Sequence, residues 1–216
     1  MPKPYYFYTT LLIALLIFVA CLMMNGPMRP GLPVADDLVT RMAYINANLT
    51  LWQWGWLSWM VAALSLLAFA VMLSTELPHG AARQYGVLLV ALGMAPDLMA
   101  ETLYAFVMPQ VSIANIALLQ FIDNLAMHLT GFLGNGLYNL GGMVLTLALL
   151  KQQPALKLWL SPGILAWILG LGLSVAIALQ QLTLAEYFTA ASMVLSTAWF
   201  VLIAWKLWGA SNVRRT

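Results

Sequence analysis

Residues 85–108 read YGVLLVALGMAPDLMAETLYAFVM, and this stretch decides the fold. A helix needs about 20 apolar residues to cross about 30 Å of hydrocarbon, and this stretch is long enough to do so. Asp97 and Glu101 nevertheless lie inside it. Inserting an acidic side chain at the centre of a span costs about 2.5–3.5 kcal/mol of free energy. Inserting a leucine is favourable by only about 0.3–0.6 kcal/mol. The stretch therefore predicts a membrane-spanning helix whose acidic face is turned toward protein, water or a ligand.

The rest of the chain has the composition of a membrane protein. Of its 216 residues, 63% are hydrophobic and 7% are charged, and the mean hydropathy is +0.89. Soluble domains carry about 25% charged residues. No polar stretch is long enough to form a separate soluble domain, so residues 1–216 are predicted to form a single transmembrane domain. The net charge of +2 does not support binding to nucleic acid, and the lone cysteine, Cys21, excludes an internal disulfide.

Hydropathy predicts an all-α transmembrane bundle with about six spans. Their approximate ranges are 6–24, 51–74, 85–108, 126–150, 158–180 and 185–208. Residues 112–150 are nearly twice as long as one span, because a helix rises only about 1.5 Å per residue. We interpret them as a short interfacial helix near 112–124 followed by the fourth span, and the alternative is two half-spans broken near residues 134–136. A short surface helix is also expected over residues 36–48.

Basic residues predict the orientation of the spans. With six spans, one side of the membrane holds Lys3, Arg83, Lys151, Lys157, Lys206, Arg214 and Arg215, and the other side holds Arg29 and Arg41. Cytoplasmic loops are enriched in lysine and arginine, so both termini are predicted to be cytoplasmic. Tryptophans near the ends of spans two and six are interpreted as anchors at the membrane interface; they are Trp52, Trp54, Trp56, Trp59, Trp205 and Trp208.

Two polar helix faces are predicted to meet inside the membrane. Asp97, Glu101 and Tyr104 follow i, i+4, i+7 spacing, so they share one face of the third span. In the fourth span, polar and small residues recur every three or four positions: Asn124, His128, Gly131, Asn135, Asn139 and Gly142, with Tyr138 beside them. Because the two spans run in opposite directions, Asp97 is expected near residues 135–139 and Glu101 nearer His128.

The charge of the acidic pair needs a partner. Two carboxylates one helical turn apart cannot both ionise cheaply in a low dielectric, so either one is protonated or a cation lies between them. The candidate cations are Arg41 from the outer loop, a charged His128, or a metal ion held by Asp97, Glu101 and His128. In the structural alternative, the acids and the amides of Asn135 and Asn139 hydrogen bond between helices. The glycines of span four and the small residues of spans five and six are interpreted as packing positions.

No motif in the chain specifies a reaction or a cofactor. The patterns G-x-S-x-G and H-E-x-x-H and a phosphate-binding glycine loop do not occur. Only His79 and His128 are present, which excludes bis-histidine haem and the multi-histidine sites of membrane hydroxylases. Whether the protein is an enzyme stays open on the sequence alone.

Three segments carry a resemblance to other proteins. LWQWGWLSW (51–59), DLMAETLY (97–104) and NGLYNLGG (135–142) resemble segments of uncharacterised polytopic, six-span bacterial inner-membrane proteins. Together they cover about 25 of the 216 residues. The resemblance implies a multi-pass protein of the bacterial cytoplasmic (inner) membrane and transfers no activity.

The sequence therefore supports three hypotheses. The first is a polar pocket that opens outward and binds or translocates a small molecule, a lipid headgroup or a cation. Its candidate ligand-binding residues are Asp97, Glu101, Tyr104, His128, Asn135, Tyr138, Asn139 and Arg41. The second is a membrane-embedded, lipid-modifying enzyme in which the acids and His128 perform acid–base or metal chemistry. The third is an accessory or assembly subunit that binds a membrane-protein partner or a second copy of itself.

Overall fold

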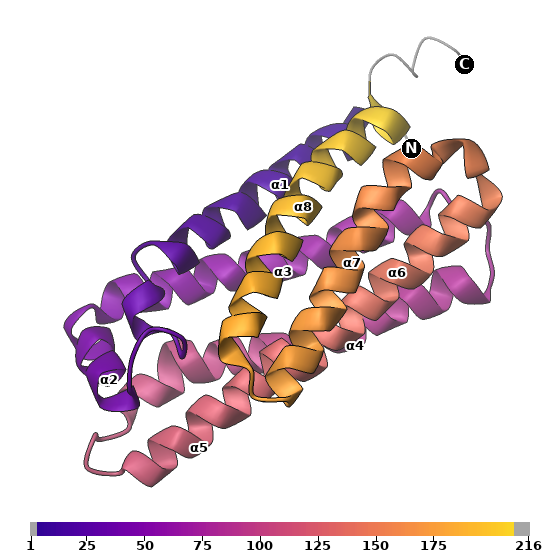
Figure 1. Cartoon of the computed structure of the whole chain (residues 1–216). Coiled ribbons are helices and arrows are strands. Elements are labelled where there is room, and N and C mark those ends of the chain that lie inside the picture. The colour runs from indigo at the N-terminus through magenta and orange to yellow at the C-terminus, as the bar shows by residue number, and fades with distance from the viewer. Residues whose placement is uncertain (1–3, 210–216) are drawn as a thin grey trace.

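The computed structural model describes residues 4–209, which are almost entirely helical and contain no strand. Six helical stretches in this part of the chain are long and apolar enough to cross a membrane, so the predicted bundle is confirmed. The spanning helices are α1 (Pro4–Asn25), α3 (Leu49–Ser74), α4 (Ala81–Thr102), α6 (Asn135–Gln152), α7 (Lys157–Ala178) and α8 (Leu182–Trp208). Two shorter helices, α2 (Leu38–Ala47) and α5 (Ile116–Met127), lie at one end of the bundle (Figure 1). Three 3₁₀ turns, Arg29–Gly31, Met108–Gln110 and Pro154–Leu156, lie beside the connections.

The spanning helices form a closed ring that follows their order in the chain (Figure 1). α1 packs against α3, α3 against α4, α4 against α6, α6 against α7, α7 against α8, and α8 back against α1. Aromatic side chains fill part of the interior, where the rings of Phe69, Trp199 and Phe200 pack against one another. The closed ring matters for function because each spanning helix turns one side toward a common centre.

The two ends of the ring differ in the contacts that their side chains make. The start of α1 and the end of α8 lie together at one end, where the rings of Tyr6 and Trp208 are 5.6 Å apart. We call this the terminal end. The opposite end carries α2 and α5 and contains two ion pairs, Arg29 with Glu186 and Arg41 with Asp123. Six spans thus divide the loops between the ends as the sequence predicts, while the orientation of the ends in a membrane stays a prediction.

The stretch between α4 and α6 contains a short helix followed by the fourth span. α5, a π-helical segment (His128–Gly134) and α6 form one helical run over Ile116–Gln152. The short helix predicted near 112–124 is thus present as α5, but it continues into the fourth span without a loop, and there is no break near residues 134–136. The run contains no proline, and the π-helical segment carries the helix through Gly134 without interruption. α5 begins after Asn115, whose side chain accepts a hydrogen bond from the backbone N–H of Leu118 at 3.3 Å.

Helices α4 and α6 touch backbone to backbone through glycines. A Cβ added at Gly93 would lie 2.6 Å from the carbonyl oxygen of Gly134, and one added at Gly141 would lie 2.5 Å from the carbonyl oxygen of Gly86. Only small residues allow two helices to approach so closely. The packing role predicted for glycines of span four is therefore confirmed at Gly134 and Gly141. The same contact brings α4 at Asp97 against the π-helical segment.

Candidate functional site

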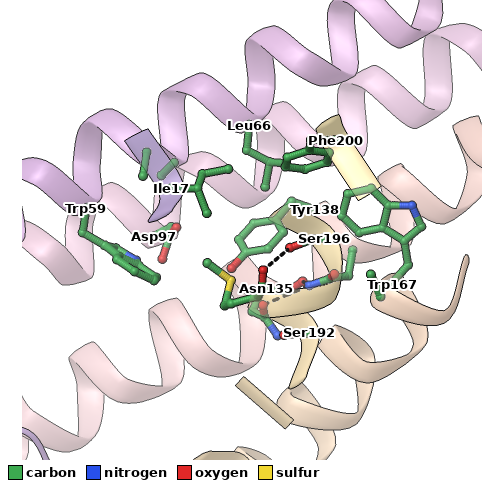
Figure 2. A pocket seen from close by; sticks show the side chains of 15 residues that line it. Ile17, Trp59, Leu66, Asp97, Asn135, Tyr138, Trp167, Ser192, Ser196 and Phe200 are labelled. Atoms are coloured by element: carbon green, nitrogen blue, oxygen red, sulfur yellow. Dashed lines mark hydrogen bonds between the residues drawn. The ribbon is translucent and has the colours of Figure 1, made fainter. Parts of the chain in front are cut away.

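A cavity of about 60 Å³ lies at the centre of the ring, and all of the spanning helices line it (Figure 2). This volume holds about four water molecules, because one water needs about 10–15 Å³ measured in this way. The lining residues are Ile17, Trp59, Ala62, Ala63, Leu66, Asp97, Asn135, Tyr138, Asn139, Ala166, Trp167, Ser192, Met193, Ser196 and Phe200. Asp97 is the only charged residue among them. The cavity thus brings together four of the predicted ligand-binding residues, Asp97, Asn135, Tyr138 and Asn139.

Asp97 is the one acidic residue of the cavity wall. The residue is only 2% exposed, and the hydroxyl group of Thr130 donates a hydrogen bond to its Oδ1. Among residues 4–209, Thr130 is its only hydrogen-bond partner. In Figure 2 the carboxyl group lies beside Trp59, and the hydroxyl end of Tyr138 points toward it. Asp97 therefore keeps one carboxylate oxygen that no donor in the described part of the chain occupies.

Asn135 of α6 joins the cavity wall to α7, and Asn139 donates back to Asn135. Asn135 donates through Nδ2 to the carbonyl oxygen of Gly170 at 2.6 Å and to Oγ of Ser174 at 2.9 Å. Asn139 donates through Nδ2 to the backbone carbonyl of Asn135 at 2.7 Å and to its Oδ1 at 2.9 Å. The interhelical hydrogen bonding expected of these amides is confirmed for Asn135. The chain of amides also fixes how α6 presents its polar side to the cavity.

Glu101 lies one helical turn after Asp97 and is isolated from every donor. The residue is 0% exposed, and neither carboxylate oxygen has a hydrogen-bond partner among the described residues. Buried side-chain polar atoms are paired in the large majority of cases, so an orphan carboxyl group needs an explanation. Helix α4 passes into a π-helical segment, Leu103–Val107, directly after this turn. π-Helical turns are frequent at functional sites, and this one has a counterpart in the segment that carries Thr130.

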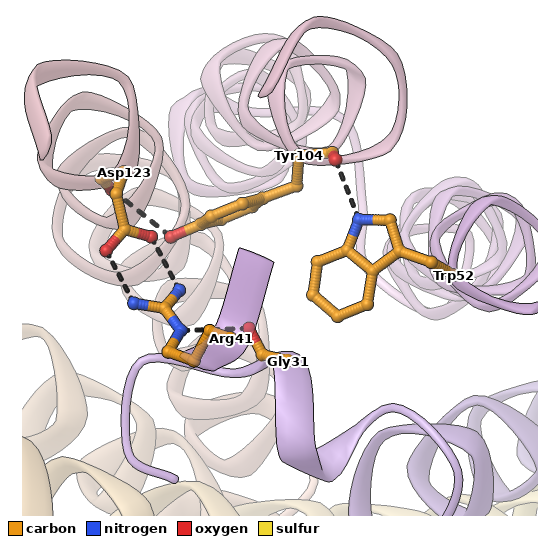
Figure 3. Close-up of polar contacts among 5 residues, drawn as sticks. All are labelled: Gly31, Arg41, Trp52, Tyr104 and Asp123. Atoms are coloured by element: carbon orange, nitrogen blue, oxygen red, sulfur yellow. Dashed lines mark hydrogen bonds and ion pairs between the residues drawn. The ribbon is translucent and has the colours of Figure 1, made fainter. Parts of the chain in front are cut away.

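Arg41 and Tyr104 belong to a separate polar cluster at the opposite end of the ring (Figure 3). The buried guanidinium of Arg41 donates to both carboxylate oxygens of Asp123 at 2.8 Å and to the carbonyl oxygen of Gly31 at 3.0 Å. The Tyr104 hydroxyl donates to the backbone carbonyl of Asp123 at 3.2 Å, and the Trp52 indole donates to the carbonyl of Tyr104 at 2.8 Å. The prediction that Arg41 neutralises the acids of span three is wrong, because a bidentate carboxylate partner on α5 holds it instead.

His128 does not join the acidic pair either. Its Nδ1 lies 2.8 Å from the carbonyl oxygen of Asn124, one turn earlier in the same helix, and the residue does not line the cavity. Residues 4–209 contain no group of three or more histidine, cysteine, aspartate or glutamate side chains that could hold a metal ion. The three-residue metal site suggested by the sequence, Asp97 with Glu101 and His128, is therefore not assembled.

The sequence pattern does not indicate several residues of the candidate site. Thr130 does not fall on the α-helical stripe of span four, because the π-helical turn between it and Asn135 shifts the helix face. Ser192 and Ser196 line the cavity, although their spacing in span six was consistent with packing alone.

Trp52 and Trp56 are only 1% and 4% exposed, so they are core residues and not interfacial anchors. Trp208 is buried in the same way and donates to Glu76 at 2.8 Å.

No basic residue in the described part of the chain neutralises Asp97 or Glu101. The ion pairs among residues 4–209 join Arg29 to Glu186 and Arg41 to Asp123, and both lie at the opposite end of the ring. Helix α3, which packs against α4, has no titratable side chain. The negative charge of the acidic pair is therefore neutralised by protons or balanced by a cation from solution.

Comparison with known proteins does not add a family to this description. No protein-family model matches the chain, and no curated protein and no solved structure matches it either. The function is therefore argued from the geometry and the charges of the central cavity.

Proposed function

We propose that this protein binds a small cation in the central cavity of its membrane-spanning ring and carries it across the membrane. Asp97 is the anionic group that holds the cation. The observation that carries the proposal is the buried acidic pair, Asp97 and Glu101, for which the described chain supplies no basic partner.

The energetic argument concerns the cost of an unpaired charge. An ionised carboxylate in a low-dielectric interior costs several kcal/mol unless a counter-charge and hydrogen bonds compensate it. Acidic residues inside spanning segments are rare for this reason and commonly mark the path of an ion or a proton. Asp97 receives one hydrogen bond, from Thr130, and faces a space large enough for a few water molecules. A cation in that space provides the missing counter-charge.

The lining of the cavity supports a cation over a lipid headgroup. A volume of about 60 Å³ accommodates an ion with a few waters, whereas pockets for drug-sized ligands measure about 300–1,000 Å³. The lining offers oxygen atoms from Asp97, Asn139 and Tyr138 and from two serines of α8. The hydroxyls of Ser192 and Ser196 donate to carbonyls of their own helix, so their lone pairs stay available as acceptors. Carboxylate, amide and hydroxyl oxygens are the ligands that hard cations prefer.

Transport follows if the two ends of the ring open in turn. The opposite end is closed by the Arg41–Asp123 pair and by Tyr104, which link α2, α5 and the end of α4. We place the protein in the bacterial inner membrane with the terminal end in the cytoplasm, as the distribution of lysine and arginine supports. A cation bound at Asp97 would then lie between the two ends of the ring, of which the opposite end is closed by this cluster.

The lipid-modifying hypothesis has less support. An acid–base pair must be within hydrogen-bond reach of one another or of the same substrate, and His128 instead contacts the Asn124 carbonyl of its own helix. The hypothesis of an accessory subunit stays a prediction without an observation in its favour.

Calorimetric titration of the purified protein tests the proposal directly. Na⁺, K⁺, Mg²⁺ and Mn²⁺ are added in separate experiments to the unchanged chain, to Asp97→Asn and to Asp36→Asn. Asp36 is an exposed acid of the opposite end, so D36N removes the same charge outside the cavity. A contact with an ionised group contributes about 1.5–3 kcal/mol, so D97N should bind the preferred cation roughly 10- to 100-fold more weakly. D36N should bind it as the unchanged chain does.

The proposal fails if none of these cations binds to the unchanged chain. It also fails if D97N, with an unchanged helical content and elution volume, binds the cation as tightly as D36N.

A further inference from the structure

We propose further that the cation passes between the central cavity and the terminal end along the seam where α1, α3 and α8 meet. Thr10 supplies an oxygen ligand within this seam, and the rings of Phe69 and Phe200 are the barrier that closes it in the structure. This inference rests on the proposed function and extends it by naming one half of the path and the residues that lie on it.

One face of α1 runs from the cavity to the terminal end. Its residues recur every three or four positions: Tyr6, Thr10, Ala14 and Ile17. Such spacing places them on the same side of a helix. Ile17 lines the cavity, and the ring of Tyr6 lies 5.6 Å from that of Trp208 at the terminal end. Thr10 therefore lies between the cavity and the terminal end, about 10 Å along the helix from Ile17.

The hydroxyl group of Thr10 has no partner. The residue is 0% exposed, and its Oγ1 makes no hydrogen bond within the described chain. Two other threonines of the spanning helices, Thr146 and Thr189, donate to the carbonyl oxygen four residues earlier at 2.7 and 2.8 Å. Buried polar atoms are paired in the large majority of cases, so the exception at Thr10 needs an explanation. Hard cations prefer oxygen ligands, and this oxygen is free to act as one.

Small side chains lie beyond the cavity on the two helices that pack against α1. Leu66 of α3 and Phe200 of α8 line the cavity. One turn further toward the terminal end, the same helices carry Ala70 and Ala204, which are 4% and 0% exposed. Both alanines belong to one buried apolar cluster. A methyl group occupies less space than any longer side chain, so a small separation of these helices is enough to admit an ion.

Two aromatic rings close the seam beside the cavity. The ring centroids of Phe69 and Phe200 are 4.2 Å apart, and these rings join α3 to α8. Figure 2 shows Phe200 beside Leu66 at the edge of the cavity. Neither ring offers an oxygen atom to replace the water that a cation must shed. A cation therefore passes only when the two rings move apart.

Glu76 lies at the terminal end of the same seam. Its Oε1 accepts a hydrogen bond from the indole N–H of Trp208 at 2.8 Å, and the residue is partly exposed. Trp208 is the residue whose ring contacts Tyr6, one turn before Thr10. Oxygen ligands thus occur at both ends of the seam, on Asp97 in the cavity and on Glu76 at the terminal end, with Thr10 between them.

Transport into vesicles that contain the purified protein tests this inference. The cation is the one of Na⁺, K⁺, Mg²⁺ and Mn²⁺ that the unchanged chain binds most tightly, and a fluorescent indicator sealed inside the vesicles reports its entry. Thr10→Val removes the oxygen and keeps the shape of the side chain, whereas Thr10→Ser keeps the oxygen. Thr9→Val is the matched control, because Thr9 is the partly exposed neighbour at the same depth on another side of α1.

T10V should separate binding from transport. In calorimetric titration it should bind the cation as the unchanged chain does, because Asp97 is intact. Its transport should be roughly five- to tenfold slower, which corresponds to the loss of one uncharged polar contact on the path. T10S and T9V should carry the cation at the rate of the unchanged chain.

Cysteine labelling gives a second measurement, because Cys21 is the only cysteine of the chain. Thr10→Cys and Leu12→Cys are each made together with Cys21→Ala, and a small cationic thiol reagent is added to the vesicles during transport. Leu12 is 54% exposed on the outside of the ring, where lipid excludes a charged reagent. T10C should react faster than L12C, and the transported cation should slow its reaction.

The outcomes separate this inference from the proposed function. If the unchanged chain binds and carries a cation while T10V is as fast as T9V, the cation does not pass Thr10, although Asp97 still binds it. A T10C that reacts no faster than L12C while transport proceeds would also overturn the path. If the unchanged chain binds no cation, both proposals fall. Should T10V fail to fold, the labelling of T10C decides.

Discussion

Asp97 and Asp123 are both acidic residues set among apolar helices, but their charges are balanced in different ways. Asp123 accepts two hydrogen bonds from Arg41 at 2.8 Å, so its counter-charge is part of the fold. Asp97 accepts one hydrogen bond from Thr130, an uncharged residue. Glu101 accepts none. At the scale of single residues, Arg41, the one buried arginine among residues 4–209, pairs with Asp123 at the opposite end of the ring, and the central acids have no basic partner in the described chain.

The Arg41–Asp123 pair should make a large contribution to stability. Its side chains are 4% and 14% exposed, and removing one partner of a buried pair leaves an uncompensated charge that costs about 3–5 kcal/mol. We expect Arg41→Leu to lower the free energy of unfolding in detergent by roughly that amount, while the double variant R41L/D123L recovers most of the loss. Arg29→Leu is the matched control, because the Arg29–Glu186 pair is 45% and 32% exposed and such pairs contribute about 0–1 kcal/mol. An R41L variant no less stable than R29L would contradict this account.

At the scale of elements, α-helical periodicity predicts much of the candidate site. The prediction fails where the helix is π-helical. Asp97, Asn135 and Asn139 were found from their spacing, since each lies on a regular α-helical face. Thr130 was missed because it lies in a π-helical segment, which no residue pattern in the chain indicates. The partner of Arg41 could not be predicted, because it required the place of α5 beside α2, two elements more than 60 residues apart in the chain.

The short helix α2 gives a pH-dependent prediction. Asp37 caps its N-terminus, accepting hydrogen bonds from the side chain of Thr40 at 2.7 Å and from the backbone N–H groups of Thr40 at 3.2 Å and Val39 at 2.9 Å. These bonds, led by that from the Thr40 side chain, hold the pKa of Asp37 below its ordinary value. A lowered pKa stabilises the folded form above the pKa of the unfolded chain, about 3.9, and this contribution is lost as the pH falls through the folded value.

Hydrogen exchange in α2 checks this prediction. The unchanged chain should protect the first turn of α2 above about pH 4 and lose protection on further acidification. Asp37→Asn keeps a capping oxygen without a titrating group, so its protection should not depend on pH. Asp37→Ala should show weak protection at every pH. Equal pH dependence in D37N and the unchanged chain would show that another group is responsible.

At the scale of the whole molecule, the sequence predicts the number of spans but not their closed order. Hydropathy locates each helix because a bilayer demands about 20 apolar residues for every crossing. It does not predict that α8 packs back on α1, since lipid-facing and core-facing leucines look alike in a chain that is apolar throughout. The closed ring is what converts two polar helix faces into a cavity that all of the spanning helices line. The pocket predicted between two spans is therefore a property of the complete bundle.

Anomalous X-ray scattering from crystals that contain Mn²⁺, with a parallel crystal in Rb⁺, tests the central claim most directly. The account predicts one dominant anomalous peak inside the cavity with Mn²⁺, within about 2.0–2.6 Å of a carboxylate oxygen of Asp97, as is usual for hard cations. The peak should vanish in crystals of D97N. A cavity without anomalous density for either ion, or a dominant peak on an exposed acid such as Asp36, would contradict the claim that this membrane protein binds its cation at the centre of the ring.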